Sequence, residues 1–142
     1  MLDEDRKNLI KVRLEHAEEC LQSAKELEQS GDYRGSANRS YYAIFHSMRA
    51  VLANDGVDMR KHSGVIAEFR KRYIKTGKLD TQLSDIISIL FDARIGSDYD
   101  DFYLISKKEV KDQIENAQSF VESVKGYLKE ENSLDPNKIK KE

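Results

Sequence analysis

Proline and cysteine are almost missing from this sequence of 142 residues. The one proline, Pro136, stands near the C-terminal end, so no proline interrupts a helix before it. The one cysteine, Cys20, excludes an intramolecular disulfide and any metal site built from several thiolates. We expect Cys20 to be a small core residue in a protein of a reducing compartment.

An excess of either charge is also missing, since the formal net charge is only −2. No global basic field therefore attracts nucleic acid, and any RNA site must be a local patch. No run of residues approaches the roughly 18 apolar positions of a transmembrane span. The charged N-terminal segment has no apolar stretch of the signal-peptide type. We expect a cytoplasmic protein with no membrane association.

Helix-forming residues in helical periodicity dominate the rest of the sequence. They predict an all-α fold, an up-and-down helical bundle of four to five helices. The expected helices span about residues 4–29, 33–53, 63–76 and 81–94, and a last helix follows residue 106. Ser63 is expected to cap the third helix, and Ser106 with Glu109 forms a capping-box pattern. Residues 1–130 should make the bundle, with a polar tail over 131–142.

The segment 38–52 is apolar around most of its circumference, which is typical of a helix in the middle of a bundle. It nevertheless carries Arg39 and His46, seven residues apart. These two side chains lie on nearly the same helix face, about 10 Å apart along the axis. The same helix has a line of small residues that would let a neighbouring helix approach closely, in the same chain or in a dimer partner. They are Ser36, Ser40, Ala43, Ser47 and Ala50.

Arg39 and His46 are candidate catalytic residues. An arginine can hold a phosphate, and a histidine can move a proton near neutral pH. Together they could cleave RNA without a metal, and Arg94 at the end of the fourth helix is a further candidate. Two helical turns separate Arg39 from His46, so joint action on one phosphate needs a second helix. The alternative is structural: a core hydrogen bond for His46 and acidic partners for both arginines.

The segment 60–78 is strongly basic, with seven lysines and arginines against Glu68 alone. Within it Arg70, Lys71 and Arg72 could track a phosphate backbone, or they could line a solvated helix face. An acidic aromatic loop, residues 96–103, follows the fourth helix. Its Tyr99 could stack a base or pack against the bundle. The aspartates there fit no calcium-loop pattern, and we expect no metal or other cofactor.

Three motifs together resemble one family. They are Arg39-x-Tyr41-Tyr42-Ala43-x-Phe45-His46, then His62 with Phe69, then Arg94-x-x-x-Asp98-Tyr99. These motifs resemble the HEPN domains (higher eukaryotes and prokaryotes nucleotide-binding), in particular their small stand-alone prokaryotic branch, over roughly residues 5 to 130. The resemblance implies a helical bundle that usually dimerises. It also implies a toxin–antitoxin pair with a minimal nucleotidyltransferase as partner, and metal-independent ribonuclease activity in active members.

Active members of that family have four to six residues between an arginine and the histidine that follows it. Arg39 and His46 have this spacing, whereas Arg94 is followed by Tyr99 where a histidine would stand. Some related toxins are silenced by nucleotide transfer onto a tyrosine, for which Tyr99 and Tyr103 are candidates by position. Three hypotheses remain open. The chain is a ribonuclease toxin, a non-catalytic module that binds a nucleotide, RNA or a protein partner, or a purely structural homodimer.

Overall fold

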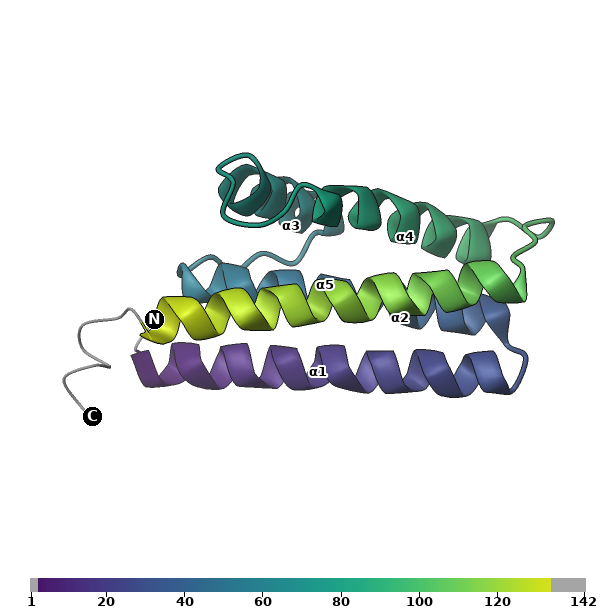
Figure 1. Ribbon diagram of the computed structural model, residues 1–142, viewed down its shortest axis with the longest axis horizontal. Helices are drawn as coiled ribbons and strands as arrows, with labels where there is room; N and C mark the ends of the chain where they lie inside the picture. Colours follow the sequence, from purple (N-terminus) through teal and green to yellow (C-terminus); the bar gives the residue numbers. More distant parts are fainter. Residues whose placement is uncertain (1–2, 134–142) are drawn as a thin grey trace.

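The computed structural model describes residues 3–133, which form a bundle of helices and contain no β-strand. The elements are α1 (Asp3–Gln29), α2 (Tyr33–Asn54), α3 (His62–Phe69), the π-helical turn η1 (Arg70–Ile74), α4 (Gln82–Tyr99) and α5 (Lys107–Ser133). The long helices α1, α2 and α5 run side by side, and α3 and α4 lie over one side of them (Figure 1). The predicted all-α bundle is therefore confirmed.

Helix α2 is the central element, because it packs against α1, α3, α4 and α5. The small residues along it are all buried, namely Ser36, Ser40, Ala43, Ser47 and Ala50. The Ser36 hydroxyl donates a hydrogen bond to the carbonyl of Ala24 in α1, at 2.8 Å. Near Ser36, the helix that packs closely against these small residues is therefore α1 of the same chain.

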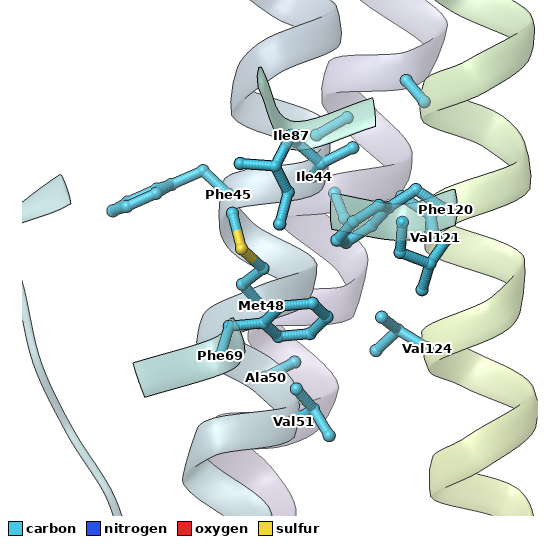
Figure 2. Packing of buried hydrophobic residues seen from close by; sticks show 14 of the residues in the cluster. Ile44, Phe45, Met48, Ala50, Val51, Phe69, Ile87, Phe120, Val121 and Val124 are labelled. Atoms are coloured by element: carbon cyan, nitrogen blue, oxygen red, sulfur yellow. The ribbon is translucent and has the colours of Figure 1, made fainter. Parts of the chain in front are cut away.

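The main core forms where α2, α3 and α5 meet. Met48 of α2, Phe69 of α3 and Phe120 of α5 are fully buried and lie in one cluster (Figure 2). Burial of each such side chain contributes about 1.5–3 kcal/mol. Phe45 belongs to the same cluster, but its ring points away from Phe69 and Phe120 in Figure 2. Its ring lies on the side of α2 that carries the polar candidate residues.

The segment after α2 differs in detail from its prediction. We expected one helix over residues 63–76 with Ser63 as its cap, but Lys61 holds the N-cap position and makes no side-chain cap. Ser63 lies inside the helix because the backbone is already helical at the residue before it, so that prediction is wrong. The helix then widens into η1, where the amide of Lys75 donates to the carbonyl of Arg70, five residues earlier. Gly77, with φ of +76°, follows η1 in a turn.

Helix α4 is longer than predicted. We expected it to end near Arg94, since Gly96 costs about 1 kcal/mol in a helix relative to alanine. The helix instead continues to Tyr99, and the amide of Asp100 donates to the Gly96 carbonyl at 3.1 Å. The ring of Tyr103 packs against Gly96 so closely that a β-carbon there would lie 2.5 Å from its Cδ2 atom. The glycine thus serves a close contact with the loop.

Helix α5 begins with the predicted capping box. The amide of Glu109 donates to the Ser106 hydroxyl at 3.1 Å, and the amide of Ser106 donates to the Glu109 carboxylate at 3.2 Å. The helix continues through Ser133, and the rest of the predicted tail, residues 134–142, lies outside the described residues. Over residues 3–133, no helix combines the length and apolar character needed to cross a membrane.

Candidate functional site

Aromatic and basic side chains gather on the partly exposed edge of α2. Tyr42, Phe45 and His46 share this edge because residues three and four apart on a helix are neighbours. Arg94 of α4 and His62 at the start of α3 lie against the same side chains. Elements far apart in the sequence therefore meet at α2, and most of the candidate residues are brought close to one another.

The guanidinium of Arg94 is surrounded by rings and one acid. Its Nε lies 3.0 Å from Oδ2 of Asp98, and its Nη2 donates to the hydroxyl of Tyr42 at 3.2 Å. Its Cζ lies within 5.8 Å of three ring centroids, those of Tyr41, Tyr42 and Tyr99. The acidic partner considered for Arg94 is thus present, and the same side chain also joins the α2 aromatics to Tyr99.

His62 is a member of the site that the sequence showed only as part of a family motif. Its Nδ1 lies 2.7 Å from the hydroxyl of Tyr41, and its ring stacks on Phe45 with centroids 4.1 Å apart. Burial and then the nearby Arg94 lower the pKa of His62. Burial also raises the pKa of Tyr41 to about 12. Tyr41 therefore keeps its proton at pH 7 and can donate it in a hydrogen bond to the neutral imidazole.

His46 lies on the other side of Tyr42, towards α1. Its ring centroid is 6.2 Å from that of Tyr42 and 5.4 Å from that of His16. Burial lowers the pKa of His46 to about 4, and repulsion by His16 and by Arg49, Arg13 and Arg39 contributes to the shift. No hydrogen bond joins His46 to any other residue within 3–133. At pH 7 it is a neutral imidazole that can accept a proton.

Arg39 is exposed and forms no ion pair within the part of the chain that the structure describes. It lies beside Cys20 of α1, where burial raises the pKa of the buried thiol and the arginine opposes that rise. Among residues 3–133, His46 therefore has no core hydrogen bond and Arg39 has no acidic partner of the kind that a structural role would require. Cys20 itself is buried, as predicted.

Arg13 and Arg49 are fixed beside His46 by a shared acid. Arg13 is buried, and its guanidinium lies 2.6 Å from Asp58 and 3.0 Å from the Arg49 carbonyl, to which it donates. Arg49 also contacts Asp58, at 3.1 Å. Hydrogen bonding from Arg13 holds the pKa of Asp58 below its usual value. One carboxylate thus compensates two arginines, and the surroundings of His46 stay cationic.

The basic segment is less available than its sequence indicates. Arg70 folds onto α4 and donates to Ser84 and Ser88 at 2.8–3.0 Å, where it lines an open groove of about 390 Å³ between α3 and α4. Arg72 pairs with Glu68 at 2.8 Å. Lys71 is exposed and forms no ion pair among residues 3–133. Their binding of RNA stays a prediction.

The exposed rings at the end of α4 and in the loop after it show why Tyr99 is a candidate contact for a base. Tyr99 is 71% exposed, and Phe102 is 91% exposed, so neither ring packs against the bundle. Tyr103, by contrast, is partly buried against Gly96. Over residues 3–133, no three His, Cys, Asp or Glu side chains come together in a group that could hold a metal ion.

Comparisons with known proteins agree on one family. The model of the HEPN domain matches residues 10–127. A UPF0332 protein of Thermotoga maritima is 31% identical over 126 residues, which cover 89% of this chain and 96% of that protein. Two proteins of Methanocaldococcus jannaschii, both named "Putative toxin", are 32% and 34% identical. Their alignments cover 90% and 92% of this chain and 87% and 96% of those proteins.

Proposed function

This chain belongs to the HEPN domain family, and we propose that it is a toxin-like protein that cleaves RNA without a metal ion. The names of its relatives support the toxin-like role. The minimal nucleotidyltransferase partner and the homodimer that its motifs imply are part of the same proposal.

The observation that carries the proposal is the state of His46. The His46 ring is half-buried, and it has no hydrogen-bond partner within residues 3–133, so its ring nitrogens remain available to a ligand. Beside it lie the exposed Arg39 and the guanidinium of Arg49, both cationic. Arg49 shares Asp58 with Arg13, whereas Arg39 has no ion pair within residues 3–133, and a neutral base beside such a cation suits a phosphodiester better than a closed structural network.

The proposed reaction uses the 2′-hydroxyl of RNA as the nucleophile. His46 accepts the proton of this hydroxyl while its oxygen bonds to the adjacent phosphorus. Because Arg39 lies two helical turns from His46, the arginine that stabilises the negative charge on the phosphorane is Arg39 of the second copy in the proposed homodimer. The bond to the 5′-oxygen then breaks, and that oxygen takes a proton. The second proton carrier is the imidazole of His16, whose ring centroid lies 5.4 Å from that of His46. The products are a 2′,3′-cyclic phosphate and a 5′-hydroxyl.

Cleavage of labelled single-stranded RNA, in the presence of a chelator, tests the proposal. We expect cyclic-phosphate products from the wild type, and a loss of about 10²–10⁴-fold in rate for His46→Ala. Arg39→Ala should also lose activity, whereas Lys129→Ala, which removes the same charge from an exposed position, should not. Intact RNA with the wild type, or equal cleavage by His46→Ala, would refute the catalytic assignment.

A non-catalytic module that binds a protein partner is the second candidate, and one observation favours it. Phe102 is 91% exposed and Leu104 is 89% exposed, next to the exposed Tyr99. Adjacent exposed apolar side chains are typical of protein interaction sites. Co-expression with a minimal nucleotidyltransferase should then give a complex that Phe102→Asp and Leu104→Asp disrupt. A protein that binds neither RNA nor nucleotide nor this partner would fit the purely structural homodimer.

A further inference from the structure

Arg34, near the start of α2, holds the C-terminal end of α4 and the loop that follows it. Its Nη1 donates to the carbonyl of Ser97 at 2.7 Å. Its Nη2 contacts three further carbonyls, those of Asp100 at 2.8 Å, Asp101 at 3.2 Å and Tyr103 at 2.7 Å. One guanidinium therefore binds four backbone oxygens between residues 97 and 103. A cation is also favourable at this place because the C-terminal end of a helix carries partial negative charge.

Two other contacts hold the same loop. Tyr103 packs its ring on Gly96, as described above, which leaves no room for a β-carbon. The Asp98 carboxylate accepts hydrogen bonds from the Asn38 amide at 3.0 and 3.2 Å, and it pairs with Arg94. The loop is thus fixed at both of its ends and at its acidic side chain.

Tyr99 is the last residue of α4, and Arg34 fixes the backbone on both sides of it through the carbonyls of Ser97 and Asp100. The Tyr99 ring is 71% exposed, and its centroid lies 5.8 Å from the guanidinium carbon of Arg94. Helix ends fray, so an exposed ring on an unrestrained last turn would sample many positions, and ordering it on binding would cost free energy. The contacts of Arg34 remove part of that cost before any ligand arrives.

We propose that Arg34 is a positioning residue for RNA: it holds the C-terminal end of α4, with Asp98 and Tyr99, so that Tyr99 and Arg94 together form a platform for one base. This inference rests on the proposed RNA-directed function of the site. Arg34 does not touch the RNA. It acts through the backbone of residues 97–103 and through the placement of the Tyr99 ring.

The experiment compares Arg34→Ala, Arg34→Lys and Gly96→Ala with the wild type. Gly96→Ala displaces the Tyr103 ring and disturbs the loop while Arg34 stays in place. This variant therefore still tests the role of the loop if Arg34→Ala fails to fold. Arg6→Ala is the matched control, because Arg6 makes a single 3.5 Å hydrogen bond to a backbone carbonyl in another part of the molecule. Binding is measured by fluorescence anisotropy with a labelled single-stranded RNA whose 2′-hydroxyl groups are replaced by 2′-methoxy groups. Amide hydrogen exchange over residues 98–104 reports on the loop itself.

We expect Arg34→Ala and Gly96→Ala to speed exchange in this loop and to weaken RNA binding about tenfold, the loss expected for one stacked base. Arg34→Lys should recover part of the affinity, and Arg6→Ala should match the wild type. In a Tyr99→Ala background, Arg34→Ala should weaken binding less than about twofold, because the platform is already gone.

Two results would overturn the inference in different ways. Faster loop exchange with unchanged RNA affinity, or an equal loss in the Tyr99→Ala background, would show that Arg34 has a structural role only. A wild type that binds no RNA would refute the proposed function and, with it, the role of Arg34 in RNA positioning.

Discussion

The low pKa of His46 predicts a measurable loss of stability in mild acid. The unfolded chain protonates this histidine near its ordinary pKa of 6.5, whereas the folded chain resists protonation until about pH 4. A group with a depressed folded-state pKa binds more protons when unfolded, so folding stability is full above pH 6.5 and declines as the pH falls towards 4. The complete difference corresponds to about 3.4 kcal/mol, and at pH 5 it amounts to about 2 kcal/mol.

The assay is urea unfolding of the wild type and of His46→Gln at about pH 7.5 and about pH 5. Asp58 and His62 titrate in both proteins, so their contributions cancel in the comparison. We expect the wild type to lose about 2 kcal/mol more than the variant between the two pH values. Equal losses in both proteins would refute the argument, because His46 would then not be held neutral by its surroundings.

A second measurement follows the same group directly. The ring proton of His46 should titrate by NMR near pH 4, well below an exposed histidine. His16→Gln should raise this pKa, because repulsion by His16 is the largest cause of the shift after burial. Arg49→Ala should act in the same direction. No change in either variant would leave burial as the only cause of the shift.

Three further predictions concern stability, and each is measured by denaturant unfolding. Arg13→Met should lower the free energy of unfolding by about 2–3 kcal/mol, because it breaks the hydrogen bond to the Arg49 carbonyl and removes one cation from Asp58. Asp58→Asn should lower it less, since Asp58 is half exposed. Tyr73→Phe should cost about 1–2 kcal/mol, since its buried hydroxyl bonds to Asp55 and lies 3.0 Å from the Val51 carbonyl; an unchanged midpoint would contradict this. Ser106→Ala should cost about 1 kcal/mol through loss of the α5 cap, and Ser106→Thr should restore most of it.

The ends of several helices could be predicted because the signals are local. Ser106 with Glu109 caps α5 as predicted, and the two residues are only three positions apart. The position of α2 at the centre also followed from its apolar circumference. These features depend on residues that lie close together in the sequence, where periodicity and capping rules apply directly.

The arrangement of the site could not be predicted in the same way, because its contacts join distant segments. The hydrogen bond between Tyr41 and His62 joins residues 21 positions apart in the sequence, and the hydrogen bonds of Arg34 join residues 63 to 69 positions apart. Nothing in the local pattern around Arg34 distinguishes it from a solvated arginine. Likewise, Arg70 reads as an available cation, yet it is held by the serines of α4. Sequence shows which groups are present, and tertiary contacts decide which remain available.

The same cationic surroundings that destabilise protonated His46 should favour an anionic ligand. Arg13 and Arg49 share one carboxylate, Arg39 has no ion pair within residues 3–133, and His16 lies against His46. A phosphate bound among these groups would offset their mutual repulsion and would make protonation of His46 less costly. On the proposed function, RNA binding therefore raises the pKa of His46 and takes up protons below about pH 6, in line with linkage between binding and titration. The imidazole would then be a base in the free protein and a better proton carrier once the phosphate is in place, which is the change in basicity that cleavage requires.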